Sequence, residues 1–310
     1  MPKPFRFAVQ LATASSGDDW RQKARRAEAL GYSTLYLPDH FGEQLGPLVA
    51  MTVAAEATEK LNVGCLVFDN DYRHPIVLAK EMATLDLMAE GRVEFGLGAG
   101  WMKSDYDESG IDYDEPKVRV DRFEEGLAII RELWRDGRAD FDGGHYKVTG
   151  AQGQPRPHTP GGPKLVIGGG GRRVLSIAAR EADIVGVNPN LKAGYVGPEV
   201  AASSSGDLYR KRLEWIKEAA GDRFSDLELQ CLTFFVQITD DADKAIADLA
   251  PLFGLTPEQA AQVPLALVGS HKGIAELLRQ RREEYGLSYT VVQEGAMEDF
   301  APVVEELAGS

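Results

Sequence analysis

The sequence has few cysteines, no long hydrophobic run and no recognisable signal peptide. Its two cysteines, Cys65 and Cys231, lie far apart in strand-like segments, which predicts small buried side chains in a reducing compartment and no disulfide framework. No run of about 18 apolar residues is present, so a transmembrane helix is excluded by length. Because the N-terminal residues lack the pattern of a signal peptide, we expect a cytoplasmic protein.

Basic residues and the motifs of several enzyme classes are also scarce. The 34 basic and 48 acidic residues give a net charge of -14, which disfavours nucleic acid and anionic membranes as partners. The five histidines form no His-x-His or His-x-x-x-His pair, and neither cysteine lies in a Cys-x-x-Cys motif, so no metal site is predicted. Neither a Gly-x-Ser-x-Gly nor a Walker A sequence occurs, which disfavours an α/β-hydrolase and a P-loop enzyme.

What the sequence does contain is a regular alternation of strand-like and helix-like segments. Eight units of strand followed by helix, with no reset, predict a (β/α)8 TIM barrel over a doubly wound sheet, as one domain over residues 1–310. The eight strand-like segments cover residues 5–11, 33–37, 62–68, 92–97, 164–167, 183–187, 227–238 and 288–292.

Two polar stretches interrupt the alternation. Residues 101–117, after the fourth segment, are rich in acidic side chains, and residues 188–205, after the sixth, contain a run of small residues. They predict insertions after strands 4 and 6, and the second predicts a mobile loop over the barrel mouth. Residues 141–146 predict a hairpin with a glycine turn.

In a barrel of this kind, functional residues follow the carboxyl ends of the strands. Asp39 and His40 follow the second segment, and a carboxylate that orients an imidazole provides a proton donor or acceptor near neutral pH. The alternative is a capping aspartate beside a structural histidine. Gly98-Ala99-Gly100-Trp101, after the fourth segment, would let a flat ligand approach the backbone. Its alternative is a tight turn next to a core tryptophan.

A glycine-rich loop follows the fifth segment. Gly168-Gly169-Gly170-Gly171 leads into a helix that begins with Arg172 and Arg173. Backbone N–H groups at a helix start, together with two guanidinium groups, predict a phosphate site. The alternative interpretation is a flexible turn without a ligand.

In their order and spacing these motifs closely resemble the bacterial luciferase-like family of barrel oxidoreductases. The resemblance extends from about residue 5 to residue 292, and within the family the sequence is most similar to the branch that uses coenzyme F-420, an 8-hydroxy-5-deazaflavin, instead of FMN. The segments that carry it are Glu28 to Tyr32, Asp39-His40, Arg73-His74-Pro75, Gly91 to Val93, Gly96 to Trp101 and Gly168 to Gly171.

This resemblance implies a flavin or deazaflavin across the carboxyl face of the barrel. The ring would lie against a bulge after the third strand, where relatives have a non-proline cis peptide, here expected at Cys65-Leu66. His40 would transfer a proton, with Asp39 as its partner. The other residues implied at the cofactor are Gly98, Ala99, Gly100 and Trp101 at the ring, and Gly169, Gly170, Gly171 and Arg172 at the phosphate.

One position departs from the family pattern. The sugar-phosphate and alcohol dehydrogenases of the F-420 branch have a glutamate directly after the strand-four glycines, where this sequence has Trp101. Their substrates therefore cannot simply be transferred to this chain. With an indole in place of a carboxylate, we expect an apolar or planar substrate.

The leading hypothesis is an oxidoreductase that transfers a hydride between coenzyme F-420 and an unidentified small-molecule substrate, the cofactor carrying the redox chemistry. An FMN-dependent luciferase-like monooxygenase is the alternative within the family. A non-catalytic flavin-binding protein is the alternative from another class. The resemblance also implies a homodimer.

Overall fold

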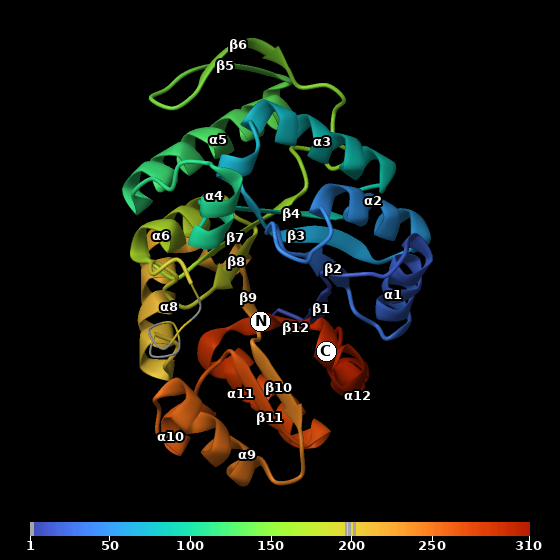
Figure 1. The fold of residues 1–310 in the computed structure, drawn as a ribbon, viewed down its shortest axis with the longest axis vertical. Helices are drawn as coiled ribbons and strands as arrows, with labels where there is room; N and C mark the ends of the chain where they lie inside the picture. The colour runs from blue at the N-terminus through green and yellow to red at the C-terminus, as the bar shows by residue number, and fades with distance from the viewer. Residues whose placement is uncertain (1–2, 196, 198–199, 201–202) are drawn as a thin grey trace.

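The protein forms a closed barrel of eight parallel strands with helices outside it (Figure 1). The computed structural model describes residues 3–195, 197, 200 and 203–310. Around the barrel the strands follow the order β1-β12-β9-β8-β7-β4-β3-β2, which confirms the predicted (β/α)8 architecture. The barrel strands are β1 (Arg6–Gln10), β2 (Thr34–Leu37), β3 (Asn62–Asp69), β4 (Val93–Gly98), β7 (Lys164–Gly169), β8 (Ile184–Val187), β9 (Glu228–Leu232) and β12 (Leu287–Gln293).

The helices begin where the sequence provides capping residues. Ser16 accepts a hydrogen bond from the Asp19 amide at the start of α1, and Ser270 does the same for Gly273 at α11. Three other helices, α2, α3 and α5, begin with a proline, whose missing N–H costs nothing in the first turn. The longer helices are α1 (Gly17–Ala29), α2 (Pro47–Ala57), α3 (Pro75–Met88), α5 (Pro116–Asp136), α6 (Arg172–Glu181), α8 (Gly206–Ala220), α11 (His271–Tyr285) and α12 (Met297–Leu307).

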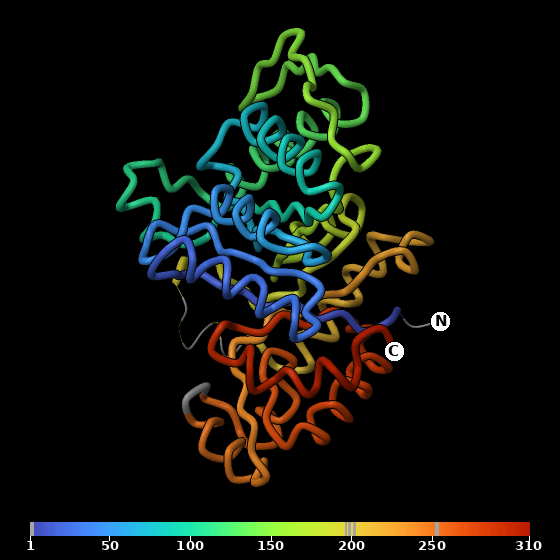
Figure 2. Tube along the Cα trace, turned by 90° about the vertical axis from the view of Figure 1, so that its right-hand side faces the viewer, coloured from blue at the N-terminus to red at the C-terminus, as the bar shows by residue number. Residues whose placement is uncertain are grey.

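Shorter elements lie in the connections. They are the helices α4 (Lys103–Ser109), α9 (Ala242–Leu249) and α10 (Pro257–Ala261), and the 3-10 turns η1 (Asn70–Tyr72), η2 (Gly221–Asp226), η3 (Ala250–Phe253) and η4 (Glu294–Ala296). No helix in the described ranges has both the length and the apolar character needed to cross a bilayer. The first and last described segments lie side by side (Figure 2), because the Phe5 amide donates to the Ser310 carbonyl at 3.1 Å.

The two predicted insertions are present. After β4 the chain forms α4 and α5 and then the predicted hairpin, an antiparallel pair of β5 (Arg138–Asp142) and β6 (Lys147–Gln152) at one end of the molecule (Figure 1). Residues 188–205 form the second insertion after β8. Residues 196, 198–199 and 201–202 lie outside the described part of the chain, so the mobility of this loop stays a prediction.

A third insertion, after β9, differs from the sequence prediction. Residues 227–238 were expected to form one strand, but the chain turns at Thr233, whose backbone N–H and hydroxyl both donate to the Val291 carbonyl. The second half becomes β10 (Phe235–Ile238), which leaves the barrel and pairs with β11 (Ala266–Gly269). Helices α9 and α10 lie beside this small sheet (Figure 1). An uninterrupted apolar run in the sequence does not reveal that its second half pairs with a strand outside the barrel.

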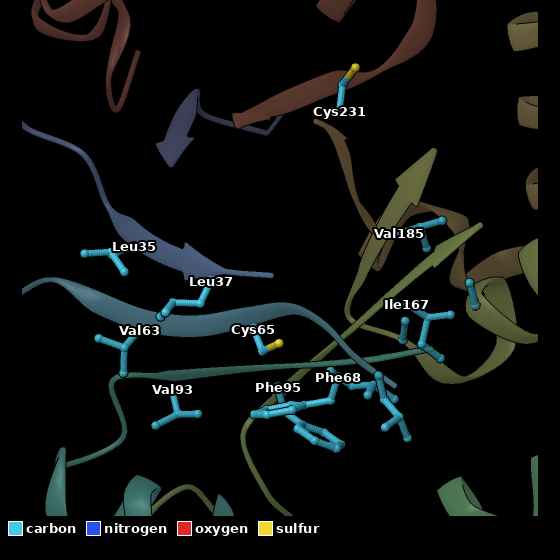
Figure 3. Close-up of a cluster of buried hydrophobic side chains, with 14 of the residues drawn as sticks. Leu35, Leu37, Val63, Cys65, Phe68, Val93, Phe95, Ile167, Val185 and Cys231 are labelled. Atoms are coloured by element: carbon cyan, nitrogen blue, oxygen red, sulfur yellow. The ribbon is translucent and has the colours of Figure 1, made fainter. Parts of the chain in front are cut away.

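Apolar side chains fill the space between the strands and the surrounding helices. Because successive residues of a strand point to opposite faces, Leu35 and Leu37 belong to this outer core, whereas Tyr36 belongs to the cluster inside the barrel. Figure 3 shows Leu35 and Leu37 near Val63 of β3 and Val93 of β4. Cys231, like Cys65, is buried with a free thiol.

Charged groups fill the amino end of the barrel interior. Arg6 forms ion pairs with Glu94 and with Glu228, the latter at 2.6 Å between Nη1 and Oε2. The hydroxyls of Tyr36 and Tyr289 also donate to Glu94, Tyr289 at 2.9 Å. Burial raises the pKa of Glu228. Since these groups satisfy one another, the amino end is closed, and the carboxyl end is the face that remains for a ligand.

Candidate functional site

A cavity of about 650 Å³ opens at the carboxyl ends of the barrel strands. Its size is within the range typical of small-molecule and cofactor sites. The residues that line it include Gln10 from β1, Asp39 and His40 after β2, Leu66 and Val67 from β3, Gly98 to Met102 after β4, Gly168 to Gly171 after β7, Asn188 to Lys192 after β8, Gln230 from β9 and Gln293 from β12.

His40 lies in the cavity wall and is paired with a carboxylate from the insertion after β4. Its Nδ1 is 2.6 Å from Oδ2 of Asp105, and Asp105 also accepts hydrogen bonds from the Tyr72 hydroxyl at 3.0 Å and the Phe41 amide at 3.4 Å. The imidazole and the Trp101 ring are nearly perpendicular, with 5.6 Å between their centroids. With Nδ1 bound to Asp105, Nε2 is the nitrogen left to exchange a proton with a ligand.

Asp39 is not the partner of His40, and this part of the prediction is wrong. Its carboxylate instead binds both terminal nitrogens of Arg73, at 2.6 and 2.9 Å, and accepts from the Asp69 amide at 3.0 Å. Neighbouring residues in extended backbone point in opposite directions, so Asp39 and His40 form separate contacts. Asp39 still lines the cavity, but its charge is neutralised by Arg73.

Asp69 is a second titratable group and lies in the wall behind Asp39. The Tyr106 hydroxyl is 3.1 Å from Oδ2 of Asp69 and 3.0 Å from Oδ2 of Asp71. A hydroxyl has only one proton to donate, and Asp71 is the carboxylate that faces a cation, with Arg122 at 2.9 Å. Burial, followed by the charges of Asp71 and Asp39, raises the pKa of Asp69 to about 7. Asp69 is therefore the carboxyl group that holds a proton near neutral pH.

This protonation should affect the pH dependence of stability. Because the folded-state pKa of Asp69 is raised from 3.8 to about 7, the folded state binds a proton that the unfolded state releases. Its contribution to the free energy of unfolding is thus present below about pH 4 and is lost as pH rises toward 7. Between pH 4 and pH 7, the Tm of Asp69→Asn should fall by a few degrees less, roughly, than the Tm of the unmodified protein. Parallel melting curves for the two proteins across this range would contradict the assignment.

The bulge expected after the third strand is present, one residue later than predicted. The pairing of β3 with β4 shifts register between Cys65 and Phe68, and the non-proline cis peptide is Leu66-Val67, not Cys65-Leu66. Leu66 and Val67 line the cavity, whereas the Cys65 side chain is fully buried in the outer core. The bulge needs a glycine opposite it, since a Cβ at Gly96 would lie 2.0 Å from the Cys65 carbonyl oxygen.

The glycines after β4 form one wall of the cavity, as predicted. Gly100 has φ +73°, and a Cβ there would lie 1.9 Å from the Tyr106 hydroxyl, so no other residue fits without displacement. Its carbonyl accepts from Arg119 at 2.7 Å, which holds the turn. Ala99 and Trp101 also line the cavity. The backbone between β4 and α4 is therefore accessible to a flat ligand.

The glycine loop after β7, the strand that pairs with β4, also lines the cavity. Gly169, Gly170 and Gly171 all line it, and Gly171 is the N-cap of α6 without a side-chain cap. The first N–H groups of an α-helix have no acceptor within the helix. Together with the positive end of the helix dipole, they fit an anion such as a phosphate.

The two arginines at the start of α6 have different surroundings. Arg172 is exposed and pairs with Glu218 at 2.8 Å. It is not part of the described cavity wall. Its guanidinium is therefore not where the prediction put it, although its backbone N–H belongs to the first turn. Arg173 does line the cavity, where it contacts Asp121 at 2.5 Å and also Glu124. Consecutive helical residues point about 100° apart, which separates the two side chains.

The structure adds residues that sequence reasoning did not select. Asp105 belongs to the acidic stretch after β4, but nothing in that stretch distinguishes it from its acidic neighbours. Asp69 and Gln230 lie within strands and are buried. A polar residue in an otherwise apolar strand was the sequence signal that could have marked them as site residues. Within the described residues no group of three or more His, Cys, Asp or Glu side chains is arranged to hold a metal ion.

A family model described as luciferase-like monooxygenase matches residues 3–303. The chain belongs to this family. A solved structure of the same fold is the coenzyme F-420 dependent tetrahydromethanopterin reductase from Methanopyrus kandleri, with TM-score 0.77, 17% identity and coverage of 98% of each chain. This luciferase-like chain is also 31% identical over 264 residues to an F-420-dependent glucose-6-phosphate dehydrogenase of Kribbella flavida, covering 80% of the chain and 74% of the relative.

A second dehydrogenase of that name, from Amycolatopsis mediterranei, is 32% identical over 173 residues. The match covers 53% of the luciferase-like chain, and the chain spans only 51% of that relative. Similarity to these proteins confirms the family resemblance found in the sequence motifs.

Proposed function

We propose that the protein is an oxidoreductase that transfers a hydride between coenzyme F-420 and a small organic substrate that is apolar or planar. The observation that carries the proposal is one cavity that contains a glycine wall, an anion-binding helix start and a histidine paired with a carboxylate. Relatives whose names state F-420 dependence support the choice of cofactor.

The ring of the cofactor would lie against the surface that the β3 bulge and the neighbouring glycines after β4 form together. A Cβ at Gly98 would lie 2.7 Å from the Val67 side chain, so glycine at this position lets the bulge pack directly against β4. The phosphate would bind the free N–H groups at the start of α6. Bound coenzyme F-420 would supply the hydride chemistry, and the residues of the chain would orient it and handle the accompanying proton.

His40 is the residue proposed for that proton. A hydride added to one substrate atom must be balanced by a proton added to a neighbouring atom, and removal of a hydride requires the reverse. Asp105 binds Nδ1 and so fixes which nitrogen faces the ligand.

The lining favours a substrate other than a sugar phosphate. Trp101 occupies the position at which related sugar-phosphate dehydrogenases have a glutamate, and the side chains of Leu232 and Phe234 add apolar surface on the β9 side. Phe234 is 45% exposed, which is unusual for an aromatic side chain and suits contact with a planar ligand.

Binding titrations with both cofactors test the proposal. Purified protein should bind coenzyme F-420 more tightly than FMN and should not consume oxygen with reduced cofactor. An FMN-dependent monooxygenase is the second candidate, because the family description names monooxygenases. Preferential FMN binding with oxygen consumption would establish that candidate. Binding of a cofactor that no donor reduces would instead indicate a flavin-binding protein without catalysis.

The two arginines of α6 provide a matched pair of variants. Arg173→Ala should weaken cofactor binding about tenfold, which corresponds to about 1.4 kcal/mol, because a cation at the cavity wall is lost. The effect is moderated by the Asp121 and Glu124 carboxylates that already pair with Arg173. Arg172→Ala removes an exposed arginine paired with Glu218 and should change affinity by less than about twofold. Fluorescence titration measures both, and equal losses would contradict the assignment.

A further inference from the structure

Three arginines are buried and form no ion pair within the described part of the chain. They are Arg119, Arg212 and Arg281, which are 3%, 4% and 4% exposed. A buried cation without a counter-ion is costly, so each of them needs another source of stabilisation. Arg119 lies over the Tyr113 ring at 4.2 Å, and Arg281 donates to three backbone carbonyl oxygens. Arg212 has two carbonyl acceptors among the described residues, and one of them belongs to the glycine loop after β7.

Arg212, from α8, connects the two loops that meet at the candidate anion site. Its Nε donates to the Gly170 carbonyl oxygen at 3.1 Å, and its Nη1 donates to the Ser203 carbonyl oxygen at 2.8 Å. The Ser203 hydroxyl in turn accepts a hydrogen bond from the Asn190 amide at 2.9 Å. Gly170 and Asn190 both line the cavity, whereas Arg212 is outside the described cavity wall. The guanidinium group therefore contacts the glycine loop from behind.

The contact with Gly170 fixes the direction of a donor in the cavity wall. In a trans peptide the carbonyl group and the following N–H group point in opposite directions, and the peptide between Gly170 and Gly171 is trans. The N–H of Gly171 therefore points away from Arg212, and no backbone carbonyl in the described ranges accepts a hydrogen bond from it. Gly171 lines the cavity as the N-cap of α6. Arg212 thus holds an unused N–H donor at the start of α6 in one orientation.

The charge of Arg212 is the second part of the argument. Burial lowers the pKa of this guanidinium group, since no described carboxylate forms an ion pair with it. Charges that are separated by a few ångströms of buried backbone are screened much less than charges in water. The neighbouring Arg172 and Arg173 already have carboxylate partners in Glu218 and Asp121. Among these three arginines, Arg212 is therefore the one whose counter-ion would come from a ligand.

We propose that Arg212 is the buried counter-ion and positioning residue of the anion site, where it stabilises a bound phosphate through the peptide between Gly170 and Gly171 without touching it. The identity of this phosphate as part of coenzyme F-420 rests on the proposed function; the requirement for an anion does not. An anion at the start of α6 completes an ion pair across the glycine loop. Neutralising Arg212 therefore weakens anion binding even though its side chain does not line the cavity.

Inorganic phosphate, titrated into the protein without cofactor and followed by phosphorus NMR, is the probe. Arg212→Gln removes the charge but keeps an amide donor, and it should bind phosphate about tenfold more weakly than the unmodified protein. Arg212→Lys keeps the charge but loses the planar group that reaches two carbonyl oxygens, and it should stay within about threefold. A role confined to holding the loops would instead weaken both variants alike, which would overturn the proposal.

Arg281→Gln is the matched control. Arg281 is as buried as Arg212 and also donates to backbone carbonyl oxygens, but it is outside the described cavity wall. This variant should bind phosphate as tightly as the unmodified protein does. Equal phosphate affinities of Arg212→Gln and Arg281→Gln would overturn the proposal, and so would an unmodified protein that binds no phosphate.

A surface variant tests the charge without altering Arg212, and it decides the question if Arg212→Gln does not fold. Leu208 is exposed and lies four residues before Arg212 in α8, and residues four apart share one face of a helix. Leu208→Glu supplies a carboxylate partner and should weaken phosphate binding about threefold, whereas the uncharged Leu208→Gln should leave it unchanged. Equal affinities of these two variants would contradict the role of the charge. Because the titration contains no cofactor, its failure is distinguishable from a failure to bind coenzyme F-420.

Discussion

His40→Asn should lower kcat by about 10² to 10⁴ while leaving the affinity for the cofactor nearly unchanged, because general acid–base catalysis typically contributes a factor of this size. The asparagine retains polarity at this position but cannot carry the proton. A hydride transfer without a positioned proton donor or acceptor must use water instead. Steady-state kinetics with the first substrate identified, together with a cofactor titration, provides the measurement.

A second variant separates the proton from its orientation. Asp105→Asn keeps the imidazole but removes the carboxylate 2.6 Å from Nδ1. We expect a smaller loss of kcat than for His40→Asn and an unchanged affinity for the cofactor, since the imidazole remains but its Nδ1 is no longer held by a carboxylate. A kcat equal to that of the unmodified protein would show that Asp105 does not act through His40.

A second histidine serves as the control for this experiment. His74 is the N-cap of α3, where its Nδ1 accepts from the Ile76 amide at 3.3 Å, and it is outside the described cavity wall. Asparagine is also a good N-cap, so His74→Asn should keep both stability and kcat. Turnover by His40→Asn at the rate of this control would refute the proposed role of His40.

The sequence predicts the barrel because its signal is local and repeated. Each strand-like run is followed by its own helix, and capping residues such as Ser16 and Ser270 mark where helices begin. The exception is informative: β10 continues the apolar run of β9, and the hydrogen bonds of Thr233 to Val291 mark where the two strands divide. That division depends on a contact across 58 residues, which no local pattern contains.

The candidate site was predicted in its backbone parts more accurately than in its side-chain pairs. Gly98 to Trp101 and Gly169 to Gly171 line the cavity, because a glycine loop after a strand has few alternative positions in this fold. The partner of His40 was predicted wrongly, since sequence proximity favoured Asp39, whereas the contact is with Asp105 from another insertion. Arg172 and Arg173 could not be distinguished, because the rotation of α6 about its axis is set by packing.

The loop after β7 gives the most direct test of the anion site. A Cβ at Gly170 would lie 2.0 Å from the carbonyl oxygen of Pro189 and 2.8 Å from the amide nitrogen of Asn190. Both are backbone atoms of the insertion after β8, so they cannot move aside as a flexible side chain would. Gly170→Ala should therefore separate the two loops at the end of the cavity where the phosphate would bind.

We expect Gly170→Ala to weaken coenzyme F-420 binding about a hundredfold, the upper part of what one or two charge-assisted hydrogen bonds contribute. Gly46→Ala is its control: Gly46 is outside the described cavity wall, no atom lies within 4 Å of an added Cβ, and its φ of -60° is accessible to alanine. This variant should bind the cofactor within about twofold of the unmodified protein. Fluorescence titration of both variants, after Tm has shown that each is folded, compares a methyl group added at the contact of the two loops with one added outside the cavity. Equal affinities would mean that contact between the two loops is not required, and the anion would then have to bind elsewhere in the cavity.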